Sequence, residues 1–172
     1  MVTALVAALL SGGTLPQTAV AASNLPAVFI SACLNGTVKL TPSEATPMAF
    51  SELPRDLQHR LGKPASSHVW RLDSPGHAFL YVIENRATRR TSPRVCGVAA
   101  DDMDYAAAKG LVEKRVVGDV YSETGRSMQW IDSKRGYIVT VTTAGEFKIL
   151  QTDLLSDQQR KSLTKHYGSV PR

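Results

Sequence analysis

The chain has 172 residues, 43% hydrophobic and 20% charged, and a net charge of +5 from 20 Lys and Arg against 15 Asp and Glu. This length suits one domain with its own core, and the composition is typical of a globular protein rather than a disordered or coiled-coil one. The positive charge is small and scattered, which permits attraction to anionic surfaces or acidic proteins but argues against nucleic acid as a partner.

The first 21 residues have the pattern of a secretory signal peptide. They are uncharged, with an apolar run over Val2–Leu10 and an A-x-A cleavage site at Ala19–Ala21, although no Lys or Arg precedes the run. Polar residues after Leu10 make the segment a poor membrane span. We therefore predict that residues 1–21 are removed, and that residues 22–172 form a single periplasmic or secreted bacterial domain without a membrane span.

Export determines how the two cysteines are interpreted. In an oxidising compartment Cys33 and Cys96 are expected to form a disulfide, for which the chain-entropy model gives roughly 4 kcal/mol of stabilisation. The alternative is a lipobox, Ile30–Cys33, which would make Cys33 the acylated N-terminus of a lipid-anchored envelope component. Asn24 and Pro26 interrupt the apolar stretch that should precede such a site, so the disulfide is favoured.

Two helices are expected in the first third of the chain. Residues 24–36 predict a short buried helix, capped by Asn24, which Cys33 would staple to the sheet, with a buried strand as the alternative. Residues 37–48 look like an irregular connection. The second helix is predicted over residues 50–61, because apolar residues recur on one helical face: Phe50, Leu53, Leu57 and Leu61.

Three strands should follow this helix. Residues 68–72 and 77–84 flank the turn sequence Asp73–Gly76 and predict a hairpin, in which Leu72 would lie opposite His77 and Tyr81 opposite His68. A polar, basic loop then leads to a third strand over residues 95–100.

The next helix is predicted over residues 103–117. Asp101 or Asp102 would cap it, since acidic residues cluster at its start and basic residues at its end, as the helix dipole favours. Its inward face would be formed by Tyr105, Ala108, Leu111, Val112 and Val116.

The last third again predicts three strands and a helix. The strands are expected over residues 127–131, 137–143 and 146–153, and a capping box at Ser156–Gln159 should start a polar helix that ends near Gly168. Two successive units of a helix and three strands suggest a duplication, in which Trp70 would correspond to Trp130. The expected fold is α+β: an antiparallel sheet of about six strands with helices packed on one face.

The most concentrated basic feature is a group of four arginines in the loop after the second strand: Arg86, Arg89, Arg90 and Arg94. Arginine forks suit carboxylate and phosphate groups, so this loop is a candidate anion-binding site. A solvated loop is the simpler interpretation of the same residues. No aromatic residue is interleaved with the arginines, which argues against stacking on single-stranded nucleic acid.

The sequence lacks the common metal-binding motifs and the nucleophile motif of α/β-hydrolases. No G-x-S-x-G, H-x-x-x-H, C-x-x-C or phosphate-binding glycine loop occurs, so we predict no cofactor, no metal and no catalytic residue. A nucleophilic Cys96 is disfavoured because Cys33 competes for its thiol. The sequence therefore favours a non-catalytic binding module of the cell envelope, whose partner would be an acidic protein or an anionic envelope component. The alternative is an exported hydrolase whose site is assembled from distant residues, with His68, His77 and Asp101 or Asp102 as candidates.

Overall fold

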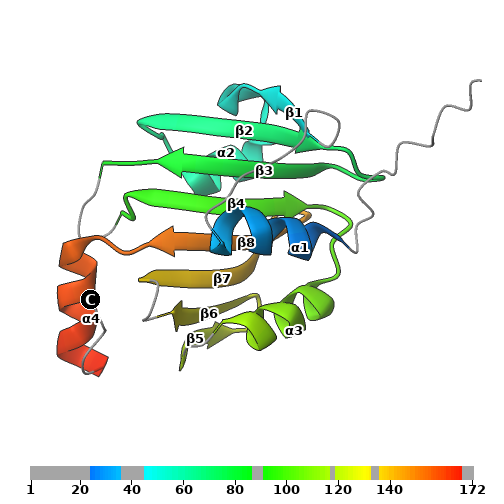
Figure 1. Ribbon diagram of the computed structural model, residues 1–172. Helices are drawn as coiled ribbons and strands as arrows, with labels where there is room; N and C mark the ends of the chain where they lie inside the picture. Colours follow the sequence, from blue (N-terminus) through cyan, green and yellow to red (C-terminus); the bar gives the residue numbers. More distant parts are fainter. Residues whose placement is uncertain (1–23, 36–44, 87–90, 117–118, 133–135, 168–172) are drawn as a thin grey trace, which may run out of the picture.

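An eight-stranded antiparallel sheet forms the centre of the molecule, with strand order β1-β2-β3-β4-β8-β7-β6-β5 (Figure 1). The computed structural model describes residues 24–35, 45–86, 91–116, 119–132 and 136–167. The strands are β1 (Ala45–Met48), β2 (Ser66–Leu72), β3 (Ala78–Glu84), β4 (Arg94–Ala100), β5 (Asp119–Thr124), β6 (Ser127–Asp132), β7 (Tyr137–Ala144) and β8 (Phe147–Leu154).

The sheet consists of two four-stranded meanders, β1–β4 and β5–β8, joined by antiparallel pairing of β4 with β8 around Val98 and Leu150. The six predicted strands are present within a few residues of their expected ends, and the α+β class is confirmed. Trp70 on β2 and Trp130 on β6 each occupy the second strand of a meander, as the proposed duplication requires. Both tryptophans contribute to the same core, but four strands separate β2 from β6.

The prediction of about six strands was wrong because it missed the two edge strands. Residues 45–48 were expected in an irregular connection, yet they pair with β2 as strand β1. Pro47 lacks an amide proton and is tolerated there because an edge strand needs hydrogen bonds on one side only. Strand β5 lacks a clean apolar alternation, and its register with β6 shifts between Val120 and Ser122.

The register predicted for the first hairpin was also wrong, by one residue. Val69 lies opposite Tyr81, and His68 lies opposite Val82. The connection is longer than the tight turn that we expected, since His77 lies outside β3. Directly paired residues share a face of the sheet, so the shift places His68 on the same face as Val82, on the side of α1 and α3, and not on the face of Tyr81.

The front face in Figure 1 is covered by α1 (Leu25–Phe29), the π-helical turn η2 (Ile30–Leu34) and α3 (Tyr105–Arg115). Leu25 and Phe29 are fully buried, and so are Ala108 and Val112 of the stripe predicted for α3. Residues 25–34 are therefore helical, which rules out the strand alternative. Asn24 precedes α1 but its side chain makes no capping hydrogen bond.

The opposite face is covered by the 3-10 turn η3 (Phe50–Glu52) and α2 (Arg55–Leu61), which Figure 1 shows behind the sheet. Leu57 packs there against Phe79 and Tyr81 in a second core cluster. The prediction of helices on one face was therefore wrong. Strand β3 is buried at six consecutive positions, and a strand with two apolar faces needs cover on both sides.

The helix predicted over residues 50–61 is split in two at Leu53 and Pro54, both of which are extended. A residue that precedes proline is disfavoured in the helical conformation, so the chain leaves the helix at Leu53 and resumes it after Pro54. Gly62 ends α2 with φ of +74°. The apolar face survives the break, because Phe50, Leu53, Leu57 and Leu61 all join the second core cluster.

Helix α3 is capped by Asp104 and not by Asp101 or Asp102. The Asp104 carboxylate accepts hydrogen bonds from the backbone N–H groups of Ala106 (2.8 Å) and Ala107 (3.2 Å). The predicted cap was wrong because the Asp101 carboxylate has other partners, at His77.

The final helix, α4 (Asp157–Tyr167), lies at one end of the sheet (Figure 1) and begins with the predicted capping box. The backbone N–H of Ser156 donates to Gln159 Oε1 (2.8 Å), and the backbone N–H of Gln159 donates to Ser156 Oγ (3.2 Å). Among the residues that the structure describes, no helix has the length and apolar character needed to cross a membrane.

Candidate functional site

The arginine-bearing end of the sheet is where β3 ends and β4 begins. Arg86 is exposed just after β3, and Arg94 is the first residue of β4. The Nε of Arg94 lies 3.4 Å from Oε1 of Glu84, and both side chains are about half exposed. Arg89 and Arg90 lie outside the described residues. The structure therefore places two of the four predicted arginines at the same end of the sheet, and one of them, Arg94, already faces a carboxylate.

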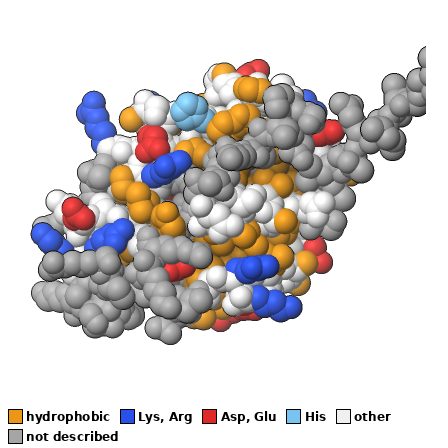
Figure 2. All heavy atoms as spheres, viewed as in Figure 1, with side chains coloured by type: hydrophobic (Ala, Val, Ile, Leu, Met, Phe, Trp, Pro, Cys, Tyr) orange, Lys and Arg blue, Asp and Glu red, His pale blue; other side chains and the backbone are white. Residues whose placement is uncertain are grey.

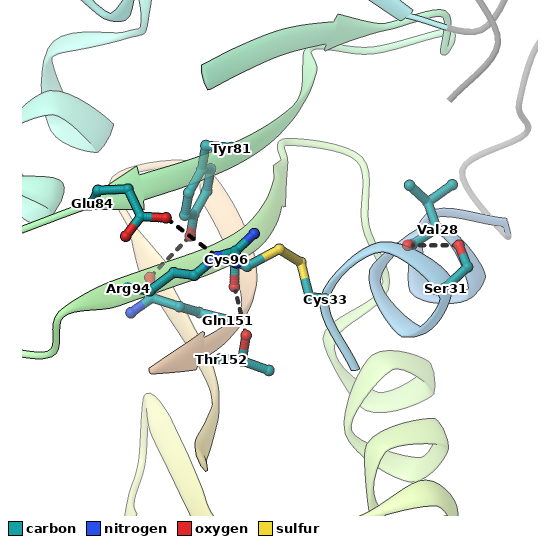
Figure 3. Close-up of a disulfide and its surroundings, with 9 residues drawn as sticks. All are labelled: Val28, Ser31, Cys33, Tyr81, Glu84, Arg94, Cys96, Gln151 and Thr152. Carbon is teal, nitrogen blue, oxygen red and sulfur yellow. Dashed lines mark hydrogen bonds and ion pairs between the residues drawn. A yellow bond between two sulfur atoms is a disulfide. The ribbon is translucent and has the colours of Figure 1, made fainter. Parts of the chain in front are cut away.

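The predicted disulfide is present between Cys33 of η2 and Cys96 of β4, with a Cα–Cα distance of 5.4 Å (Figure 3). Both cysteines are buried, and the chain contains no other cysteine. The disulfide leaves no thiol at Cys96 to act as a nucleophile, and it occupies the Cys33 sulfur that a lipid anchor would need.

A cavity of ≈ 80 Å³ lies against this disulfide. Its lining combines the η2 turn with three neighbouring strands: Ala32, Cys33, Arg94, Cys96, Tyr137, Thr152 and Leu154. Figure 3 shows Arg94 and Thr152 on either side of Cys96, with Thr152 Oγ1 donating to the Cys96 carbonyl (3.2 Å). Arg94 brings a guanidinium to an otherwise mainly apolar cavity, so an anionic group that enters it would meet a charged hydrogen-bond donor.

The face that carries this cavity has no continuous basic patch on its described surface. Figure 2 shows hydrophobic side chains through the middle of that surface, with Lys and Arg at separate places towards its margins. The net charge of +5 is thus spread out, and electrostatic attraction at this face depends on individual arginines such as Arg94.

The structure does bring together two residues of the hydrolase alternative. His77 Nδ1 lies 3.0 Å from Asp101 Oδ2, and the His77 backbone N–H donates to Asp101 Oδ1 (3.0 Å). Burial raises the pKa of Asp101, but the hydrogen bonds and the charge of His77 outweigh it and leave that pKa lowered. Lys148 Nζ also donates to the Asp101 backbone carbonyl. The pair ties the β2–β3 turn to the start of the α3 region.

A catalytic interpretation of this pair is weakened by its setting. The His77 side chain is 64% exposed, whereas a general base normally works in a site that excludes water. His68 is not part of the pair and stacks on Trp70, with ring centroids 6.1 Å apart. Across the described ranges, no three His, Cys, Asp or Glu side chains converge as metal ligands would.

Sequence reasoning missed a second cavity, which opens between α2 and the β7–β8 turn. It has a volume of ≈ 360 Å³ and is lined by Asp56, His59, Arg60, Ala144 and Gly145. The charged residues lie on the polar side of the predicted helix, so the helical pattern could have placed them on one surface. Nothing in the pattern could have shown that the β7–β8 turn lies against them.

A buried polar network behind α2 was missed as well. The Tyr81 hydroxyl donates to Gln151 Oε1 (2.9 Å), and Gln151 Nε2 donates to both carboxylate oxygens of Asp153. Burial raises the pKa of Tyr81 far above its usual range, so the hydroxyl stays protonated and remains a donor. Burial also raises the pKa of Asp153, against the opposing effects of Gln151 and Arg60. This network ties β3 to β8 across β4.

Comparison with protein-family models, with curated proteins and with solved structures returned no significant match for this chain. The features of the described residues that bear on function are the two cavities, the His77–Asp101 pair and the disulfide.

Proposed function

We propose that this protein is a small exported module of the bacterial cell envelope that binds a partner without catalysing a reaction. An anionic partner, either an acidic protein or an envelope component, contacts it through the arginine-bearing end of the sheet. The observation that carries this proposal is that Arg94, one of the four arginines singled out in the sequence, lines the cavity beside the disulfide.

The size of this cavity favours recognition of a partner's side chain or terminal group over binding of a whole small molecule. Small-molecule sites usually enclose about 300–1,000 Å³, and the cavity beside Arg94 has ≈ 80 Å³. Because the Arg94–Glu84 contact is long and half exposed, it is worth little, and a partner carboxylate or phosphate can replace Glu84. Arg86, which is exposed just after β3, adds a second positive charge at this end of the sheet.

The exported location remains part of the proposal. It is supported by the signal-like residues 1–21 and by a disulfide, which persists in oxidising compartments. Intact-mass measurement on protein from the native envelope, alkylated before and after reduction, tests it directly. A mass that begins near Ala22, with both thiols blocked until reduction, is expected. A mass that retains Met1, or thiols that alkylate without reduction, would contradict export.

Binding is tested with two anionic probes, a fluorescent hexaglutamate peptide and vesicles that contain phosphatidylglycerol. We expect Arg94→Ser, and separately the double variant Arg89→Ser with Arg90→Ser, to weaken binding by about tenfold, without a change in melting temperature. Arg126→Ser is the matched control, because Arg126 is an exposed arginine at the β5–β6 turn. If all four proteins bind both probes equally, the arginine-bearing end of the sheet is not the contact surface.

An exported hydrolase is the second candidate, and the His77–Asp101 hydrogen bond favours it. With Nδ1 of His77 donating to the carboxylate, Nε2 is left as the proton acceptor, which is the arrangement of a general base. Release of nitrophenol from nitrophenyl esters by the purified protein tests this activity. Turnover that His77→Gln abolishes would replace the binding proposal, whereas turnover equal to that of buffer would remove the hydrolase.

A further inference from the structure

Two opposite charges on α2 are close in sequence but do not pair. Asp56 and Arg60 are four residues apart, a spacing that places side chains side by side on a helix and favours an ion pair. Yet none of the ion pairs among the described residues joins them.

Asp56 lies against the β7–β8 turn. A Cβ atom added to Gly145 would come within 2.0 Å of Asp56 Oδ2, so the carboxylate occupies the space that a side chain would need. Gly145 also has a φ of +57°, which suits glycine in a two-residue hairpin turn. The charge of Arg60 lowers the pKa of Tyr81 and of Asp153, against the larger opposing effect of burial. Asp56 and Arg60 thus line one groove, and neither appears among the ion pairs of the described residues.

The space around them is the ≈ 360 Å³ groove lined by Asp56, His59, Arg60, Ala144 and Gly145, on the opposite face of the sheet from the disulfide cavity. Its volume falls within the range of small-molecule sites. Three of its five lining residues carry a carboxylate, an imidazole and a guanidinium, and the other two are Ala144 and Gly145.

Helix-dipole effects explain part of this arrangement. An acidic residue in the first turn and basic residues in the last turn stabilise any helix, and Asp56, His59 and Arg60 meet that pattern. The dipole accounts neither for the lack of an ion pair between Asp56 and Arg60 nor for a glycine turn that leaves room for the Asp56 carboxylate. A simple anion would be repelled by Asp56, and a simple cation would be repelled by Arg60.

We propose that this groove binds a small zwitterionic group, in which a primary ammonium and a phosphate or carboxylate are joined by a short linker. The ammonium donates hydrogen bonds to Asp56, and Arg60 donates to the anionic end, with His59 beside it. This chemistry occurs in free amino acids and in the phosphoethanolamine head group of lipids. The site is separate from the arginine-bearing end of the sheet, so it is an additional property and does not depend on the proposed function.

Calorimetric titration of the full mature protein at neutral pH and low salt tests the proposal. The probes are O-phosphoethanolamine and glycine, with ethanolamine and inorganic phosphate as single-charge analogues. We expect a zwitterion to bind at least about tenfold more tightly than either analogue, and Asp56→Asn and Arg60→Gln each to weaken it by about tenfold.

Two matched variants control for the loss of a charge on a helix. Asp157→Asn removes an exposed acid from the first turn of α4, and Arg115→Gln removes an exposed base from the last turn of α3. Neither should alter zwitterion binding. Vesicles of phosphatidylethanolamine, compared with vesicles of phosphatidylcholine, distinguish the sources, since the choline ammonium has no proton to donate.

Tight binding of phosphoethanolamine and its vesicles supports the proposal and identifies a lipid head group, whereas tight binding of glycine alone supports it and identifies free amino acids. Equal binding of phosphate and phosphoethanolamine, unaffected by Asp56→Asn, would make the groove a plain anion site and overturn the proposal. Absence of binding by both zwitterions up to about 10 mM would overturn it as well.

Discussion

Gly97, in the middle of β4, is the position where the structure makes its sharpest prediction about stability. It lies opposite Tyr81 on β3 and opposite Gln151 on β8, so the tyrosine crosses it to reach the glutamine. A Cβ at this position would lie 2.3 Å from the Tyr81 hydroxyl oxygen, 2.5 Å from its Cζ and 2.8 Å from the Leu150 carbonyl oxygen. We therefore expect Gly97→Ala to be strongly destabilising.

The loss of stability expected for Gly97→Ala depends on which neighbouring atoms would have to move. Tyr81 is fully buried and the Leu150 carbonyl belongs to the backbone of β8, so neither can shift freely. Overpacking in a core typically costs about 1–3 kcal/mol, and this site belongs at the upper end, near 3 kcal/mol. For a chain of this length the melting temperature should fall by about 6–12 °C.

Urea and thermal unfolding followed by circular dichroism measure the effect, with Gly110→Ala on α3 as the control. A Cβ at Gly110 meets no atom within 4 Å, so this variant should gain about 0.5–1 kcal/mol from helix propensity.

Tyr81→Phe alone should cost about 1–3 kcal/mol, because Gln151 loses its donor. The double variant Gly97→Ala with Tyr81→Phe should lose about 1 kcal/mol less stability than the sum of the two single variants. A loss below 1 kcal/mol for Gly97→Ala would refute the Tyr81–Gly97–Gln151 packing.

Three further changes test other parts of the fold. Replacing Cys33 and Cys96 by serine removes a disulfide with a sequence separation of 63, so the free energy of unfolding should fall by about 4 kcal/mol. A urea midpoint equal to that of the native protein would contradict a stabilising role for the disulfide. Asp104→Ala should cost about 1 kcal/mol through the lost α3 cap while Asp102→Ala costs less, and the reverse order in thermal unfolding would restore the predicted cap. The lowered pKa of Asp101 implies stability that is fully present above about pH 3.9 and is lost as the pH falls through the folded-state value. The stability difference between the native protein and Asp101→Asn should therefore shrink in acid, and a difference that does not change from pH 7 to about pH 2 would show that the His77–Asp101 interaction does not lower that pKa.

Local chemistry in the sequence was sufficient for much of the fold. Alternation in β7, the capping box at Ser156 and Gln159, and the apolar faces of α2 and α3 identified elements that the structure confirms. Each of these features depends on a few residues that are close together in the sequence, so it can be predicted without knowing the tertiary structure. The disulfide was also predictable, because the sequence has two cysteines and an export-like start, although their pairing geometry was not.

The edge strands, the cap of α3 and the position of α2 were decided only by tertiary contacts. Strand β1 exists because β2 offers it hydrogen bonds, and Asp104 caps α3 because His77, 24 residues before Asp101, engages the Asp101 carboxylate. Helix α2 lies on the second face because β3 is apolar on both of its faces.

The candidate sites follow the same division. Composition pointed to Arg94 as a potential anion contact, but the cavity beside it needs β4, β7, β8 and η2 together. The groove at Asp56 and Arg60 forms because the β7–β8 turn meets a helix that lies about 85 residues earlier in the chain. Charged side chains show in a sequence which groups are present, whereas the distances that decide whether those groups pair with one another or face a ligand arise only when distant segments pack.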